Sequence, residues 1–117
     1  MAHVGTERRQ LVIEQLADDL RRQLENAGIV VEKIILFGSY ARGHNTDASD
    51  IDLAVVSDAF TGVRFEDMPR IIDVVTLPDA RLEIHPYSSR DFANENPFAL
   101  EILRTGVVLF DTQLVPG

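Results

Sequence analysis

Two pairs of residues near the middle of the chain have the types and the spacing to bind a cation and a phosphate group together. Gly38-Ser39 follows a run of apolar residues, and Asp50-x-Asp52 begins the next such run after ten intervening residues. Side chains two positions apart on a strand share a face, so we expect the carboxylates of Asp50 and Asp52 to point the same way. Two like charges held close destabilise each other unless a cation lies between them, and carboxylate oxygens suit Mg²⁺.

Gly38 and Ser39 would supply the phosphate-binding half of such a site. Gly38 has no Cβ, so a phosphate can approach its backbone closely. Ser39 offers a hydroxyl and an amide at the expected first turn of a helix, where backbone donors and the helix dipole favour an anion. Arg42, in the same turn, either reaches a phosphate or only ties down its own loop. Each pair alone is common, but the two together predict a site for a nucleoside triphosphate with Mg²⁺.

The pattern of apolar residues predicts the strands and helices that must position these groups. We expect helices over residues 6–27, 64–75 and 96–106, strands over residues 30–37, 51–57, 81–87 and 107–110, and a short helical turn followed by a loop over residues 38–49. The segment 71–75 fits a strand equally well. The alternation predicts an α/β (α+β) fold with one small mixed sheet flanked by helices, in which the last strand lies antiparallel at an edge.

The composition excludes several other classes of protein. A length of 117 residues suffices for one domain, residues 1–117, and its 19 acidic against 11 basic residues give a net charge of −8, which does not suit binding to a nucleic acid. The absence of cysteine excludes disulfides and zinc–thiolate sites. The longest apolar runs have four residues, and the N-terminus lacks the apolar stretch of a secretory signal. We therefore expect a cytoplasmic protein that does not bind a membrane.

The same residues resemble a known family. Gly38-Ser39, ten intervening residues and Asp50-x-Asp52 are similar to the signature of the polymerase-beta-like nucleotidyltransferase superfamily. The surrounding Phe-Gly-Ser-x-Ala-Arg-Gly and the small size resemble its minimal nucleotidyltransferases. Later blocks follow the order seen in such proteins, so the resemblance covers about residues 30–110. Many of these proteins are encoded beside a HEPN-domain protein and act as the antitoxin of a toxin–antitoxin pair.

This resemblance implies a nucleotidyltransferase fold and a role for each matching residue. Asp50 and Asp52 would hold two Mg²⁺ ions, while Gly38 and Ser39 would hold the β- and γ-phosphates of ATP, with Arg42 as a further nucleotide contact. The acceptor hydroxyl would then attack the α-phosphate, and pyrophosphate would leave.

The family also implies a third carboxylate, on the strand next to the Asp-x-Asp pair. Glu83, in the middle of the expected strand 81–87, is the first candidate for a catalytic metal ligand there, although the family often has aspartate at this position. Asp73 is the second candidate, because Ile-Asp-Val-Val resembles a block where other members carry their third acid. His85 would share a face with Glu83, where the alternatives are a place near the site and, as the favoured role, packing or hydrogen bonding.

The function that follows from the resemblance is that of a Mg²⁺-dependent nucleotidyltransferase. It would transfer a nucleotide monophosphate, AMP from ATP, to a hydroxyl of a partner HEPN toxin protein and so act as an antitoxin. The alternative is a binding antitoxin of little or no catalysis, whose net charge of −8 suits a basic partner. A third alternative is a nucleotide sensor that binds ATP without releasing pyrophosphate.

Overall fold

The computed structural model describes residues 2–43, 49–77, 79–93 and 96–113, and with them a four-stranded sheet and five helices. The elements follow one another in the order α1 (Ala2–Asn26), β1 (Lys33–Phe37), α2 (Ser39–Arg42), β2 (Ile51–Val56), α3 (Arg64–Val74), β3 (Leu82–Tyr87), α4 (Ser89–Ala93), α5 (Pro97–Thr105) and β4 (Val107–Asp111). The fold is therefore of the predicted α+β class.

The strands form a mixed sheet in the order β3-β2-β1-β4. β1 pairs antiparallel with both β2 and β4, whereas β2 and β3 pair in parallel. The parallel pair needs a crossover connection, which α3 provides. The prediction of a mixed sheet with the last strand antiparallel at an edge is confirmed.

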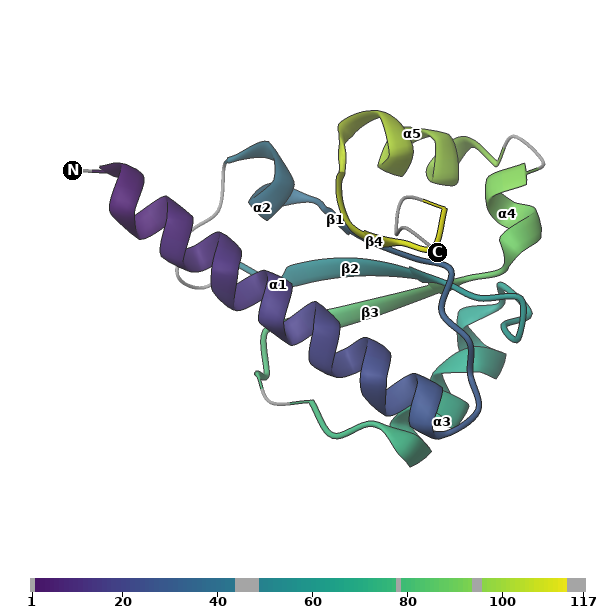
Figure 1. The fold of residues 1–117 in the computed structure, drawn as a ribbon. Helices are drawn as coiled ribbons and strands as arrows, with labels where there is room; N and C mark the ends of the chain where they lie inside the picture. The colour runs from purple at the N-terminus through teal and green to yellow at the C-terminus, as the bar shows by residue number, and fades with distance from the viewer. Residues whose placement is uncertain (1, 44–48, 78, 94–95, 114–117) are drawn as a thin grey trace.

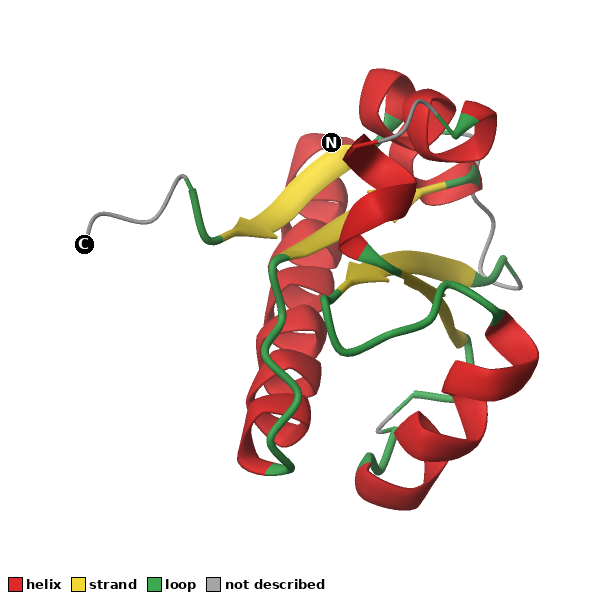
Figure 2. Cartoon of the chain, turned by 90° about the vertical axis from the view of Figure 1, so that its right-hand side faces the viewer, coloured by secondary structure: helices red, strands yellow, loops and turns green. Residues whose placement is uncertain are grey.

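One face of the sheet carries the larger apolar core. Alternate residues of the strands, such as Ile34, Leu53 and Ile84, are fully or almost fully buried there together with the inner side of α1 and with Ile71 of α3. Figure 1 shows α1 running along the whole sheet with α3 near its C-terminal end, and Figure 2 shows the same helices from the side. These two helices cover this face of the sheet.

The opposite face is covered only in part. Ile35, Ala54 and Ile102 form a small second core there beneath α5, with Phe92 of α4 packed against it. The same face carries Asp52 of β2 and also Glu83 and His85 of β3. These three side chains remain partly exposed. This uncovered end of the sheet is where polar side chains can meet a ligand.

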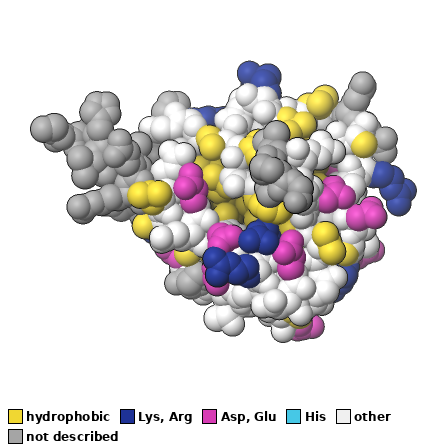
Figure 3. Space-filling model, in the orientation of Figure 1, with side chains coloured by type: hydrophobic (Ala, Val, Ile, Leu, Met, Phe, Trp, Pro, Cys, Tyr) yellow, Lys and Arg dark blue, Asp and Glu magenta, His cyan; other side chains and the backbone are white. Residues whose placement is uncertain are grey.

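Helix α1 shows how closely the apolar pattern predicts burial. The apolar residues at helical spacing are Ile13, Leu16, Ala17, Leu20 and Leu24. All are buried except Leu16, which is half-buried against the same core. The other side carries ion pairs such as Arg21 with Asp18, and acidic and basic side chains lie next to one another on this face of the molecule (Figure 3). Within the described part of the chain, no helix combines the length and the apolar character needed to cross a bilayer.

The structure decides the one element that the pattern left open. Residues 71–74 continue helix α3, so Ile71 points into the core while Ile72 and Asp73 are exposed. The short helix α4 was not predicted, because five residues are too few to show a helical period.

Candidate active site

Gly38 turns the chain from β1 into α2 at the uncovered end of the sheet. Its φ of 76° lies in the left-handed region that favours glycine. A Cβ at this position would lie 2.5 Å from Oδ2 of Asp52, which is closer than real contacts allow. The arrangement follows from the register of the antiparallel pair, in which Phe37 lies opposite Asp52. The expected glycine corner therefore lies directly against one of the expected acids.

Asp52 and Glu83 lie side by side on neighbouring strands. The parallel register pairs the two residues, so their side chains leave the sheet on the same face. His85, two positions along β3, joins them, and one ligating atom from each of the three lies within 4.8 Å of the others. All three side chains are partly exposed. The structure thus brings two of the predicted carboxylates together with the histidine that was expected to share a face with Glu83.

His85 connects the site to its surroundings. Its Nε2 lies 3.0 Å from Oδ1 of Asp52, in hydrogen-bond range. The imidazole also packs edge-on against Phe37, with the ring centroids 4.9 Å apart. The expectation of a hydrogen-bonding or packing role for His85 is confirmed in both respects.

Arg64 is the site residue that the sequence pattern did not single out. It is the first residue of α3, and its Nη1 donates a hydrogen bond of 2.9 Å to the carbonyl oxygen of Ile84. The same Nη1 lies 3.2 Å from Nδ1 of His85, and Nη2 lies 3.6 Å from Oε1 of Glu83. β3 is an edge strand, so the Ile84 carbonyl is open to a side chain that arrives from outside the sheet.

Two of the acids considered from the sequence lie outside this cluster. Asp50 immediately precedes β2 and is exposed, and it does not belong to the group of ligating side chains within 4.8 Å. Asp73 lies on the exposed side of α3 and is not a member either. Beside Asp52, the structure therefore places Glu83 rather than Asp73.

The predicted phosphate-binding residues lie in and next to α2. Ser39 begins this short helix, and the first i→i−4 hydrogen bond is the one that the amide of Arg42 donates to the carbonyl of Gly38, at 3.2 Å. The amides of the first turn precede that bond, which is the geometry that accepts anions at helix starts. Arg42 is exposed at the end of the turn. Residues 44–48 of the expected loop lie outside the described residues.

A second arginine supports α2 from the side. Nη1 of Arg81 donates a hydrogen bond of 3.1 Å to the hydroxyl of Tyr40. Arg81 is held in turn by Asp79, to whose carboxylate it donates from its side chain and from its backbone amide. These hydrogen bonds lower the pKa of Asp79 to about 2, because they stabilise the charged carboxylate.

The donor set at Asp52 and Glu83 suits a hard divalent cation. Two carboxylates lie close together in a partly exposed position, so both the attraction for a cation and the access for it are present. Oxygen ligands of this kind, completed by phosphate oxygens of a substrate, are the usual setting for Mg²⁺. The residues therefore fit the ion that the sequence analysis expects.

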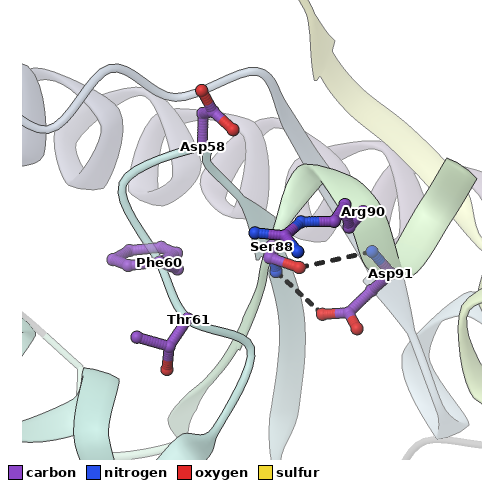
Figure 4. Close-up of a pocket in the computed structure, with 6 residues that line it drawn as sticks. All are labelled: Asp58, Phe60, Thr61, Ser88, Arg90 and Asp91. Carbon is purple, nitrogen blue, oxygen red and sulfur yellow. Dashed lines mark hydrogen bonds between the residues drawn. The ribbon is translucent and has the colours of Figure 1, made fainter.

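A separate polar pocket lies at the other end of the parallel strands, where β2 and β3 lead into their following loops. It has a volume of about 280 Å³ and is lined by Asp58, Phe60, Thr61, Ser88, Arg90 and Asp91. Figure 4 shows that Ser88 and Asp91 bond to each other within its wall. None of the predicted site residues lines this pocket, and its hydrogen bonds hold the β3–α4 turn in place.

Comparisons with known proteins concern the fold and part of the sequence. A protein of Methanocaldococcus jannaschii named "Putative protein adenylyltransferase MJ0604" is 48% identical to this chain over 46 residues, and the match covers 39% of this chain and 39% of that protein. The chain thus matches about two fifths of the length of this relative. A crystal structure of a "putative nucleotidyltransferase" from Sulfolobus solfataricus superposes with a TM-score of 0.65 at 17% identity, covering 93% of this chain and 89% of the other.

The family comparison covers more of the chain. Residues 13–99 match the model of the nucleotidyltransferase domain family, from the middle of α1 into α5. The matched part contains the glycine corner at Gly38 and the paired carboxylates of Asp52 and Glu83. Since the match extends over most of the chain and includes these groups, the chain belongs to the nucleotidyltransferase domain family.

Proposed function

We propose that the protein is a Mg²⁺-dependent nucleotidyltransferase that transfers AMP from ATP to a hydroxyl group of a partner protein. One observation carries the proposal. In a chain of the nucleotidyltransferase domain family, the carboxylates of Asp52 and Glu83 lie side by side, next to the glycine corner at Gly38. This arrangement supports a cation held by carboxylate oxygens next to a phosphate held by backbone amides.

Each residue has a distinct task in this proposal. Asp52 and Glu83, together with the exposed Asp50, would hold Mg²⁺, which when bound neutralises phosphate charge and eases deprotonation of an acceptor hydroxyl. The first turn of α2, beginning at Ser39, would bind the β- and γ-phosphates, and Arg42 would add a positive charge at their edge.

The transfer itself exchanges one phosphorus–oxygen bond for another. The acceptor oxygen forms a bond to the α-phosphorus, and the bond from that phosphorus to the bridging oxygen of the β-phosphate breaks. Pyrophosphate leaves, and the hydroxyl proton passes to solvent. The protein contributes mainly by positioning the triphosphate and compensating its charge, which is the dominant part of catalysis in phosphoryl-type transfers.

Two observations support a protein as the acceptor. The relative from Methanocaldococcus jannaschii that shares 48% identity over 46 residues carries the name of a protein adenylyltransferase. The net charge of −8 makes a nucleic acid an unsuitable partner and a basic protein a suitable one. The resemblance to minimal nucleotidyltransferases makes a HEPN-domain toxin the specific partner that we propose, with the present protein as its antitoxin.

The test is a labelling experiment with the partner present. The purified protein, Mg²⁺ and ATP labelled at the α-phosphate are incubated with the HEPN-domain protein encoded by the neighbouring gene. Label on the partner and release of pyrophosphate in equal amounts are expected, and chelation of Mg²⁺ or the variant Asp52→Asn should abolish both. Pyrophosphate release without labelled protein would exclude a protein acceptor, and the absence of both products would exclude transfer.

The same assay separates catalysis from neutralisation by contact. If the protein acts only by binding, the double variant Asp50→Asn and Asp52→Asn should still protect cells from the toxin. If transfer is the mechanism, this double variant should lose protection while it still binds the toxin. The matched control is Asp73→Asn, which removes an exposed negative charge outside the cluster.

A further inference from the structure

The contacts of His85 determine which of its two ring nitrogens carries the proton. A guanidinium group can only donate hydrogen bonds, so Nδ1 of His85, 3.2 Å from Nη1 of Arg64, must be the acceptor. In a neutral ring the proton then resides on Nε2, and this nitrogen lies 3.0 Å from Oδ1 of Asp52. The three groups form one directed chain of hydrogen bonds from Arg64 through His85 to Asp52.

This direction has a consequence for metal binding. A histidine nitrogen binds a metal through its lone pair, and a nitrogen that carries a proton has none to offer. Nε2 is the ring nitrogen that faces Asp52, and Nδ1 faces Arg64. In this arrangement His85 is a hydrogen-bond donor to the carboxylate and is withheld from the ion.

Arg64 has further contacts that position its guanidinium beside His85. Its Nη1 is anchored to the carbonyl oxygen of Ile84 at 2.9 Å, independently of the histidine. Its Nη2 lies 3.6 Å from Glu83, so the guanidinium also offsets part of the repulsion between the two carboxylates. The other ring contact of His85, the edge-on packing against Phe37, fixes the plane in which the imidazole lies.

We propose that Arg64 locks His85 in the tautomer protonated on Nε2, so that His85 orients Asp52 and the cation site consists of carboxylate oxygens. A site of oxygen ligands suits Mg²⁺ and Mn²⁺, whereas an imidazole nitrogen would favour Zn²⁺ and Ni²⁺. Arg64 and His85 are thus positioning residues that determine metal selectivity. The inference rests on the proposed function only in taking Asp52 and Glu83 as the ligands.

The first test reads the tautomer directly in the metal-free protein. Long-range ¹⁵N–¹H correlation spectra distinguish the two ring nitrogens. The wild type should show His85 with its proton on Nε2, and a proton on Nδ1 would overturn the proposal. This measurement needs no variant and no substrate, so a failure of AMP transfer would leave its outcome unaffected.

The second test is a gain of Zn²⁺ binding. Arg64→Met keeps a flexible unbranched stem but removes the guanidinium donor. Nδ1 of His85 then becomes free to take the proton, and Nε2 becomes free to bind a metal. Calorimetric titration of tag-free protein with ZnCl₂ should show affinity that is higher than in wild type by at least about tenfold. The matched control is Arg70→Met on the same helix, whose guanidinium bonds only to the carbonyl oxygen of Ala59 among the contacts described.

A third variant shows whether the gain passes through the imidazole. His85→Gln retains an N–H donor for Asp52 but removes the imidazole, so it should not bind Zn²⁺ in the same way. In the double variant with Arg64→Met, the gain in Zn²⁺ affinity should be absent. Any Zn²⁺ binding that the double variant retains measures the contribution of the other two histidines of the chain. Equal Zn²⁺ affinity of wild type and Arg64→Met, or a gain that persists without His85, would overturn the proposal.

Discussion

The backbone of Gly38 lies so close to the carboxylate of Asp52 that a side chain at position 38 would push this carboxylate out of its place. A Cβ there would be 2.5 Å from Oδ2, and the φ of 76° is itself unfavourable for any residue with a side chain. The glycine of the Gly-Ser pair therefore has a role in addition to the phosphate contact that we propose for it. It makes room for the acid that would bind the cation.

This relationship predicts that Gly38→Ala impairs the site as well as the fold. The methyl group would displace Asp52, so we expect loss of Mg²⁺-dependent ATP binding, measured by calorimetry. The matched control is Gly28→Ala at the end of α1, where φ is 88° but a Cβ would have nothing within 4 Å. It should cost stability of about 1 to 2 kcal/mol from backbone strain alone and leave ATP binding intact. Equal effects of both variants on binding would contradict the close contact at Gly38.

A second prediction concerns the identity of the third carboxylate. Glu83→Gln keeps the size and the hydrogen-bonding capacity of the side chain but removes its charge, so AMP transfer should fall by roughly a hundredfold or more. Asp73→Asn should retain the rate of the wild type, because Asp73 is exposed on α3 and outside the cluster. The initial rate of pyrophosphate release measures both variants. The opposite ranking would assign the third acid to Asp73.

Much of this arrangement could be predicted because it depends on local pattern. The two-residue period of a strand places Asp52 and Glu83 each on a definite face of its own strand, whereas the expectation that their strands are neighbours came from the resemblance to the family. The apolar stripe from Ile13 to Leu24 predicts the inner side of α1 for the same reason. In each case a side chain's direction follows from its own element.

The rest depends on contacts between elements that no local pattern encodes. Arg64 reaches Ile84 and His85 across 20 and 21 positions of sequence, and its own position marks it only as the start of a helix. Asp50 is a residue for which the local pattern predicted a position that the structure does not show. A period of two was expected to align it with Asp52, but β2 begins one residue after it, and strand geometry does not extend to a residue outside the strand.

The buried acid of α3 gives a third prediction. Asp67 is completely buried, and its two oxygens accept hydrogen bonds from the amides of Thr61 and Gly62 and from the Thr61 hydroxyl. Asp67→Ala should lower the free energy of unfolding by about 2 to 3 kcal/mol, because buried donors lose their partner. Denaturant unfolding measures this loss. The neighbouring Glu66→Ala, at an exposed position, should change stability by less than about 0.5 kcal/mol.

The outcome for Asp67 bears on the site because the loop that it holds leads directly into Arg64. If Asp67→Ala loosens the loop, the hydrogen bond from Arg64 to His85 should weaken too, and the His85 tautomer should become mixed in the ¹⁵N spectrum. If stability falls by the predicted amount but the tautomer stays unchanged, the carbonyl oxygen of Ile84 alone is sufficient to hold the guanidinium in place.

The last prediction concerns acid stability. Hydrogen bonds from Arg81 depress the pKa of Asp79 to about 2 in the folded protein, from an ordinary value of 3.8. A depressed folded pKa stabilises the fold above the unfolded value, and this contribution is lost as the pH falls from about 4 towards 2. The wild type should therefore exceed Asp79→Asn in stability at neutral pH, by no more than about 1 kcal/mol because the pair is near the surface, and the difference should vanish near pH 2. Urea unfolding across this pH range measures the difference in the free energy of unfolding. Asp58→Asn is the control for the removal of one negative charge. A difference that persists at pH 2 would mean that Asp79 acts through its shape rather than its charge.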